Sequence, residues 1–324
     1  MLLLFACAGN KIADTSHFNV VDQVLWVVDD LDNVISNWEN LGFGEIMNMD
    51  TVQFRTGNSA DPVPMRMAKA NLGGAHITWI QPLESQSIFA RFHSIYGDGA
   101  MSLVHHLKDR NALNRELERL SKLGVEVLDE VTVSTPDGDL HYVLMDTWKE
   151  GKYILGYDFG ETHERFFGET DGENTFGLKI NQYAFAIRDW EPVSHFWASL
   201  GQPEFAINHP VLGNKHYYGK PADHELIQGW QRHGTIAYEW CIPVKMPIVY
   251  DDHIKLHGEG IQHLAFTVKD MNQVLGDYES KGYVNSMGGT WGDEGKPGSG
   301  RYEYVNLEKA GGVTMELLWS YPPE

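Results

Sequence analysis

The sequence predicts an α+β fold built from four βαβββ units. The main observation is a pattern that occurs four times: a short apolar strand, an aspartate, a helical stretch and a glycine. The four aspartates are Asp30, Asp109, Asp189 and Asp270, which are 79, 80 and 81 residues apart, and the glycines are Gly42, Gly124, Gly201 and Gly282. Each aspartate opens the helix that follows it, and each glycine suits the end of that helix. A repeat of this length indicates small α+β modules rather than a solenoid.

Composition supports two domains, each made from two units, because 324 residues exceed the usual size of one domain. The formal net charge of −20 argues against nucleic acid or an anionic membrane as a partner. The only cysteines are Cys7 and Cys241, which excludes a disulfide framework and a thiolate zinc cluster. No apolar run is long enough for a transmembrane span.

Residues 1–16 are an apolar segment that we set apart from the fold. The run from Leu4 to Cys7 resembles the end of a bacterial lipoprotein signal, in which the cysteine is acylated. The segment has no basic start and is short for a signal, so a truncated start or a first strand are the alternatives. The sequence thus predicts a cytoplasmic protein, or a periplasmic, membrane-anchored one if Cys7 is a lipidation site.

The first predicted domain covers residues 17–160 and contains two units. The expected elements of the first unit are a strand at 20–28, a helix at 31–41, and strands at 44–54 and 74–82. Those of the second are a strand from about 100, a helix at 112–123, and strands at 125–133, 141–145 and 152–157. The helix at 112–123 shows the clearest amphipathic pattern.

Residues 161–177 are predicted to be a linker, because they are rich in Gly, Glu, Thr and Asp and show little periodicity. The second domain, residues 178–324, contains the other two units. The third unit has a strand at 179–187, a helix at 192–200, a long polar segment to residue 233 and a strand at 235–243. The fourth has a strand ending near 268, a helix at 271–281, a Gly-rich loop at 288–300, and strands at 301–307 and 311–319.

The first strand of the fourth unit carries a histidine with space in front of it. Alternation predicts that His263 shares one face with Ile261, Ala265 and Thr267. A histidine among small neighbours has room for a ligand, which a histidine packed among large side chains lacks.

The repeated units resemble the vicinal oxygen chelate superfamily, which includes glyoxalase I, methylmalonyl-CoA epimerase, extradiol dioxygenases and bleomycin-resistance proteins. The most specific stretches are residues 256–266, 302–306 and 312–318, which look closest to the epimerase and glyoxalase branches. The resemblance covers nearly the whole chain from Phe18. It implies two glyoxalase-like domains, each a curved, open, mixed β-sheet of two modules, with a metal on the concave face.

The resemblance also implies a set of ligand positions in the second half. These positions hold Gln182, Glu239, His263 and Glu316, the glutamine, glutamate, histidine and glutamate order of one type of glyoxalase I. Each residue alone has an ordinary explanation, such as a hydrogen-bonded strand amide or a surface charge. Two carboxylates in otherwise apolar strands are costly to bury, however, and a metal explains all four positions together. We expect one divalent metal, which the spacing leaves open among Ni, Co, Zn, Mn and Fe.

The equivalent positions of the first half predict no metal there. They hold Gln23, Thr78, Ser102 and about Gly156, with no imidazole or carboxylate. That half is instead a candidate for a structural or dimerising role, and a homodimer is one expected assembly.

Among the second-half ligands, Glu316 is the first candidate for a catalytic base by its match to the glyoxalase base, and Glu239 is the second. Weaker candidates for substrate binding are His233, Cys241 and Tyr304, although Cys241 equally suits a buried core thiol.

Three functional classes remain for a small-molecule substrate. The leading one is a glyoxalase-like lyase, isomerase or epimerase, in which a metal polarises substrate oxygens and a glutamate transfers a proton. The first alternative is an extradiol-type ring-cleaving dioxygenase, which shares the plan of a metal-free first half. Its two-histidine, one-carboxylate iron site differs from the set here. The second alternative is a non-catalytic, resistance-type binding protein, which usually lacks the ligands.

Overall fold

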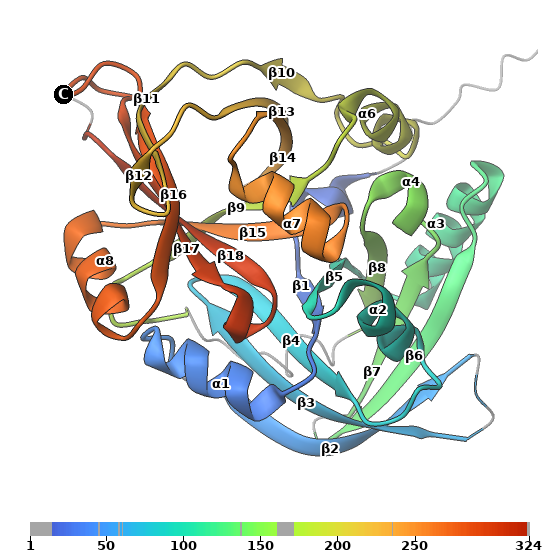
Figure 1. Ribbon diagram of the computed structural model, residues 1–324. Helices are drawn as coiled ribbons and strands as arrows, with labels where there is room; N and C mark the ends of the chain where they lie inside the picture. Colours follow the sequence, from blue (N-terminus) through green and yellow to red (C-terminus); the bar gives the residue numbers. More distant parts are fainter. Residues whose placement is uncertain are drawn as a thin grey trace, which may run out of the picture.

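The computed structural model describes residues 15–322 except 45, 58, 60, 137, 161–171 and 235 (Figure 1). The strands of the first half are β1 (Gln23–Val27), β2 (Met47–Thr56), β3 (Val63–Leu72), β4 (Ala75–Pro82), β5 (Gly99–Leu107), β6 (Val127–Thr135), β7 (Gly138–Met145) and β8 (Ile154–Phe159). Its helices are α1 (Leu31–Asn40), α2 (Ile88–Tyr96), α3 (Arg110–Lys122) and α4 (Trp148–Gly151), with a short 3-10 helix, η1, at Ser16–Asn19.

The second half contains the remaining elements. Its strands are β9 (Lys179–Ala186), β10 (Ala206–Asn208), β11 (Leu212–Tyr217), β12 (Lys220–Pro221), β13 (Glu225–His233), β14 (Ile236–Lys245), β15 (Gly260–Thr267), β16 (Val284–Trp291), β17 (Gly300–Leu307) and β18 (Val313–Ser320). Its helices are α6 (Trp190–Ser199), α7 (Val249–His257) and α8 (Met271–Ser280), with a 3-10 helix, η2, at Glu308–Ala310. The four repeat helices are capped as expected, since the side chains of Asp30, Asp109, Asp189 and Asp270 each accept a hydrogen bond from a backbone N–H of the first turn.

The sheet of the first half closes into an eight-stranded barrel, which corrects the prediction of an open sheet. Its strand order is β1-β4-β3-β2-β6-β7-β8-β5, and the antiparallel pairs β1–β5 and β2–β6 join the two modules on both sides. Large apolar side chains such as Leu25, Phe54, Met65 and Leu144 fill the interior. An eight-stranded barrel is just wide enough for side chains to fill, so closure buries this core completely.

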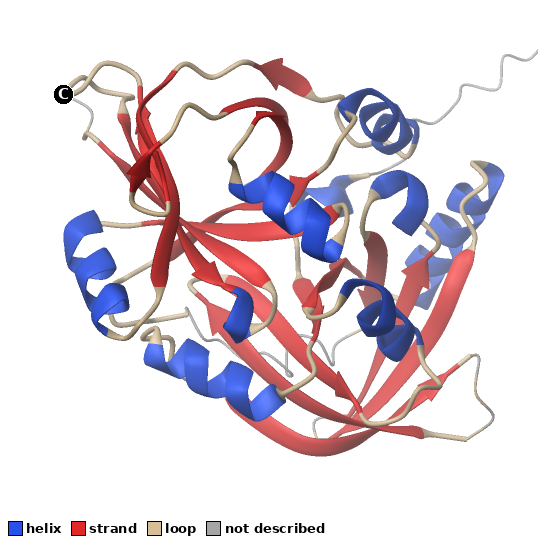
Figure 2. Ribbon diagram, viewed as in Figure 1, coloured by secondary structure: helices blue, strands red, loops and turns tan. Residues whose placement is uncertain are grey.

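The sheet of the second half is a ten-stranded sheet that does not close, in agreement with the prediction. Its order is β10-β13-β14-β9-β15-β18-β17-β16-β11-β12, so the two modules join through β9 and β15 in the middle and through β11, which pairs with β16 near one edge (Figures 1 and 2). Strands β10, β11 and β12 and the long strand β13 lie in the segment for which the sequence predicted a polar connection. The short added strands lengthen both edges, and the sheet curls around a concave face that stays open.

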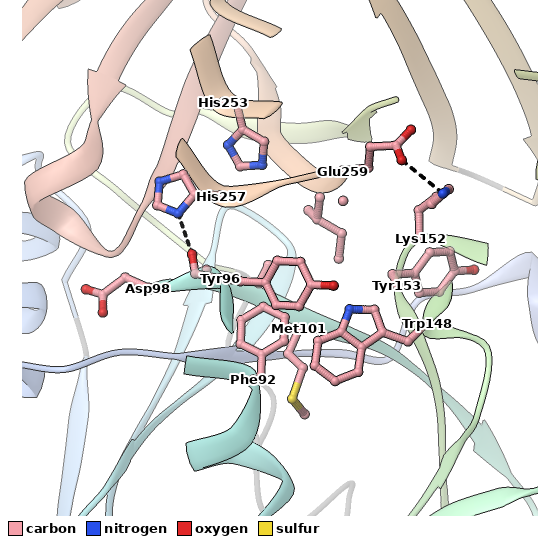
Figure 3. Close-up of a pocket in the computed structure, with 14 residues that line it drawn as sticks. Phe92, Tyr96, Asp98, Met101, Trp148, Lys152, Tyr153, His253, His257 and Glu259 are labelled. Carbon is pink, nitrogen blue, oxygen red and sulfur yellow. Dashed lines mark hydrogen bonds and ion pairs between the residues drawn. The ribbon is translucent and has the colours of Figure 1, made fainter. Parts of the chain in front are cut away.

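The two halves pack against each other through one continuous apolar core and specific hydrogen bonds. The indole nitrogens of Trp26 and Trp38 donate to the backbone oxygens of Gly311 (2.6 Å) and Ala310 (3.0 Å). Helices α2 and α7, which the sequence did not predict, face each other across the boundary. A small cavity lies there, beside the stacked rings of Phe92, Tyr96 and Trp148 (Figure 3).

Several predictions concern features outside this description. Cys7 and most of the predicted linker lie outside the described residues, so the boundaries at 17–160 and 178–324 stay predictions. Strand β8 ends at Phe159 and β9 begins at Lys179. Across the described residues, no helix is both long and apolar enough to cross a membrane. The expected homodimer likewise stays a prediction.

Candidate metal centre

Four neighbouring strands of the second sheet bring together the four predicted ligand positions. Gln182, Glu239, His263 and Glu316 lie on β9, β14, β15 and β18, which run side by side in the order β14-β9-β15-β18. Glu239 and His263 both pair in register with Ala184, and Glu316 pairs with Ala265. The alanines leave space above the sheet, so the longer polar side chains meet over them.

A β-bulge in β15 changes one part of the predicted pattern. The register shifts between Ile261 and His263, so Ile261 pairs with Phe185 and joins the apolar core on the opposite face. The prediction that Ile261 shares a face with His263 was therefore wrong, because an unbroken alternation does not allow for the extra residue.

The side-chain atoms of the cluster are close enough to share one ion. Gln182 Nε2 donates hydrogen bonds to Glu239 Oε2 (2.7 Å) and Glu316 Oε2 (3.0 Å). His263 Nε2 lies 3.2 Å from Glu316 Oε2 and 3.6 Å from Glu239 Oε2. One ligand atom from each of Glu239, His263 and Glu316 falls within 4.8 Å of the others. Histidine and both carboxylates are at most 4% exposed.

The environment of His263 favours metal binding through Nε2. Its Nδ1 lies 2.5 Å from Oε1 of Gln262, an arrangement that suits a proton on Nδ1. Nε2 then faces the two carboxylates, and it forms no hydrogen bond of good geometry with any described residue. Metal-binding histidines commonly use one ring nitrogen for the metal and donate the other N–H to an oxygen in this way.

The charges of the cluster are strongly coupled. Burial raises the pKa of the Glu316 carboxyl, and the nearby Glu239 carboxylate raises it further, against the effect of His263. Burial disfavours the charged imidazole of His263, but contacts with Glu239 and Glu316 outweigh this effect and raise its pKa to about 9. A divalent cation would take the place of the imidazole proton on Nε2, and its two positive charges would balance the two carboxylates.

The donor set fits a divalent metal. It provides one imidazole nitrogen and two carboxylates, and rotation of the Gln182 amide would add its oxygen. Mixed nitrogen and oxygen donors without thiolate suit Mn, Fe, Co, Ni or Zn. The described residues thus support a divalent-metal site in the second half.

A second layer of polar side chains supports the cluster. Gln228 Nε2 donates to Glu239 Oε1 at 2.6 Å, and the hydroxyls of Tyr250 and Tyr304 lie 2.6 Å apart. Tyr304 also hydrogen-bonds Glu316 and lowers its pKa. Sequence reasoning missed Gln228 and Tyr250, because Gln228 lay in the segment read as polar and Tyr250 lay on the unpredicted helix α7. The alternation Leu226, Gln228 and Trp230 is the signal that could have identified β13.

A cavity of about 440 Å³ lies over the cluster, within the usual size range of small-molecule sites. Apolar and aromatic side chains form most of its wall, with a few amides. The larger members of the wall are Leu212, Leu226, Trp230, Met287, Trp291, Tyr302, Tyr304 and Leu318.

The three weaker predicted site residues have different places. Tyr304 lines the cavity beside Glu316. Cys241 is fully buried below the cavity, where burial and the charges of Glu239 and Glu316 raise the pKa of its thiol well above the ordinary value. His233 is the last residue of β13, and its side chain lies outside what the structure describes.

The equivalent place in the first half holds a hydrogen-bond network. Gln23 Oε1 accepts hydrogen bonds from Thr78 Oγ1 (2.8 Å) and from the Tyr142 hydroxyl (2.9 Å). At Gly156 a Cβ would lie 2.8 Å from Ser102 Oγ, so a longer ligand side chain does not fit there without rearrangement.

Comparison with known proteins agrees with this architecture. Residues 181–298 match the profile of the glyoxalase/bleomycin resistance protein/dioxygenase superfamily. No curated protein matches the sequence significantly. A variant of 4-hydroxymandelate synthase from Streptomyces coelicolor superimposes with a TM-score of 0.63 at 13% identity, covering 94% of both chains.

Two further structures show the same fold. A halotolerant catechol dioxygenase has a TM-score of 0.51 at 8% identity and covers 94% of this chain and 90% of its own. A fusion of a xylose isomerase-like TIM barrel with 4-hydroxyphenylpyruvate dioxygenase has a TM-score of 0.51 at 15% identity. It covers 94% of this chain and 50% of its own.

Proposed function

We propose a function from one premise: the chain belongs to the glyoxalase/bleomycin resistance protein/dioxygenase superfamily, whose profile matches residues 181–298. The protein is a metal-dependent enzyme that moves a proton on a small substrate, as a lyase, isomerase or epimerase does. The observation that carries this proposal is the buried cluster of Glu239, His263 and Glu316 beneath a cavity of about 440 Å³.

The metal would be held by Glu239, His263, Glu316 and the amide oxygen of Gln182. A divalent cation bound there would polarise a substrate oxygen and make the neighbouring C–H bond more acidic. This is the chemistry that the remaining residues are placed to use.

Glu316 is the proposed general base. Its raised pKa makes it a better proton acceptor than an ordinary carboxylate, and it lies at the cavity wall. It takes a proton from the carbon next to a carbonyl group and returns it to the same or an adjacent atom. One bond to hydrogen breaks and another forms, so the step needs no co-reactant. Glu239 is the second candidate for this role.

Tyr304 is placed to orient this base. Its hydroxyl hydrogen-bonds Glu316 and also contacts the Tyr250 hydroxyl at 2.6 Å. Burial and the Glu316 charge raise the pKa of Tyr304, so the phenol keeps its proton at neutral pH and remains a donor. The Tyr250–Tyr304 pair thus restrains the Glu316 carboxylate at the cavity wall.

A ring-cleaving dioxygenase is the second candidate function. It is favoured by the whole-chain likeness to a catechol dioxygenase and to 4-hydroxymandelate synthase, which share the two-domain fold. The single imidazole and two carboxylates of the cluster weaken it, because iron oxygenases of this type use two histidines and one carboxylate. A resistance-type binding protein would need no carboxylate base facing its cavity.

Two assays on metal-loaded protein separate these candidates. Small α-hydroxy and α-oxo carbonyl compounds are incubated in deuterated water, and exchange at the carbon next to the carbonyl is followed by NMR. Exchange that is lost in Glu316→Gln supports proton transfer. Oxygen consumption with catechols by the iron-loaded protein, without exchange, would replace the proposal by the dioxygenase. Metal-independent ligand binding with neither activity would leave only a binding protein.

A further inference from the structure

One cationic side chain stands at the rim of the cavity. Arg232 pairs in register with Ala237, and its neighbour on the same strand face, Trp230, pairs with Glu239. Directly paired residues of antiparallel strands project to the same face, so Arg232 lies on the concave side with the cluster. Strand β13, which carries it, is the curved strand above β14 in the upper part of Figure 1.

Arg232 is the only arginine or lysine among the described side chains that line the cavity. Its guanidinium carbon lies 4.7 Å from the centre of the Trp230 ring, which holds it against the wall. No described carboxylate forms an ion pair with it, whereas Arg66 and Arg119 are each paired with an acid. In a chain of net charge −20, this cation is left available to another partner.

The other polar groups of the wall do not provide a second positive charge. His224 is the only described histidine that lines this cavity, and it lies 3.2 Å from the Tyr302 hydroxyl through Nε2. Burial lowers the pKa of His224 to about 4, so it is neutral at physiological pH. Apart from the carboxylates of Glu239 and Glu316, the remaining polar groups of the wall, including Asn181 and Ser320, are uncharged.

The strand register places the backbone of Arg232 close to that of Glu239. Arg232 lies one strand across and two residues along from Glu239. With strand spacing of about 4.8 Å and a rise of about 3.4 Å per residue, the two Cα atoms are roughly 8 Å apart. Both side chains line the same cavity of about 440 Å³, which is large enough for an aromatic ring or a short carbon chain.

We infer that the cavity accepts a small, flat molecule with one carboxylate, which Arg232 binds at the rim while the opposite end faces the metal cluster. Only the placement of the opposite end at the metal cluster rests on the proposed function; binding of the carboxylate by Arg232 does not. Arginine suits this role because its planar fork donates two hydrogen bonds to a carboxylate. The aromatic wall between the two ends contacts the body of the molecule.

Two matched pairs of probes test this inference by isothermal titration. Dihydrocaffeate and uncharged propylcatechol can chelate a metal, whereas phenylpropanoate and uncharged phenylpropanol cannot. Each probe is titrated into metal-loaded and EDTA-treated protein, in the wild type and in Arg232→Gln and Arg232→Lys. Arg115→Gln, an exposed arginine on α3, is the control for the change in net charge.

In the wild type, the carboxylate member of each pair should bind roughly tenfold more tightly than the uncharged member. Arg232→Gln should abolish this ratio, Arg232→Lys should retain part of it, and Arg115→Gln should keep it. A wild-type ratio near one, no measurable binding of either pair, or a ratio unchanged by Arg232→Gln overturns the inference. The same titrations test the metal proposal separately. That proposal fails if metal loading does not increase the affinity for propylcatechol relative to the affinity for phenylpropanol.

Discussion

Replacing Glu316 by glutamine should stabilise the metal-free protein. Oxygen atoms of Glu316 and Glu239 lie within 4.8 Å of each other, and both side chains are buried. At an effective dielectric constant of about 20, two negative charges at that distance repel by about 3.5 kcal/mol. His263, 3.2 Å from Glu316, offsets part of this repulsion. Burial is the first cause of the raised pKa of Glu316, so ionisation of this side chain opposes folding.

The sign follows from proton linkage. The folded-state pKa of Glu316 lies above its unfolded value of 4.5. Ionisation of Glu316 therefore destabilises the folded protein increasingly as the pH rises from 4.5 through the folded-state pKa. At pH 7 in EDTA, Glu316→Gln should therefore raise the free energy of unfolding by about 1–3 kcal/mol, measured by urea denaturation. With saturating metal the order should reverse. The wild type gains about 2.7 kcal/mol at a metal concentration of 100 times Kd, whereas the variant lacks one ligand.

Glu303 supplies a matched control, because it is equally buried but has neutralising partners. It accepts hydrogen bonds from Asn285 (2.7 Å) and Arg301, and it contacts His216 at 2.9 Å. Glu303→Gln should destabilise the protein with or without metal, because it leaves Arg301 without its charged partner. If Glu316→Gln destabilises the metal-free protein as much as Glu303→Gln does, the reasoning about the buried charge is refuted.

Three other predictions concern separate parts of the molecule. Tyr304→Phe should leave metal content unchanged but lower kcat by roughly 10–100-fold, because Glu316 loses an orienting hydrogen bond; unchanged kcat would contradict this role. Burial alone would raise the pKa of Glu116, but its contact with Arg119 outweighs this effect and lowers the pKa to about 2. The ionised Glu116 therefore stabilises the fold above pH 4.5, and this stabilisation is lost as the pH falls from 4.5 to 2. Urea denaturation at pH 7 and pH 3 should show a smaller acid-induced loss in Glu116→Gln. Gly312→Ala should cost at least about 2 kcal/mol, because its φ of 76° is unfavourable and its Cβ would lie 2.0 Å from a backbone oxygen of the first half; thermal unfolding of the variant measures this.

The sequence predicted the repeat and which four polar side chains of the second sheet meet, because both depend on local patterns. The four aspartate-capped helices follow from a side chain and a backbone N–H two or three residues apart. Gln182 and His263 lie on the first strands of their modules, and Glu239 and Glu316 lie on the last strands, which pair with those first strands.

What the sequence missed depends on contacts between distant segments. Closure of the first barrel requires β2 to pair with β6, about 75 residues later in the chain, and no local pattern encodes that pairing. Strand β13 has the alternation of a strand, but its polar residues Gln228 and Arg232 face a cavity rather than bulk solvent. Helix α7 separates two strands of the ligand set, and its Tyr250 reaches the cluster only because the helix packs over the sheet.

The most direct test of the metal centre is metal analysis of the purified protein beside two histidine variants. His263→Ala removes the imidazole of the cluster, and His216→Ala is the control, because His216 contacts Glu303 instead. The account predicts close to one divalent metal ion per chain in the wild type and in His216→Ala, and little or none in His263→Ala. Metal retained in His263→Ala, or absent from the wild type after loading, would contradict it.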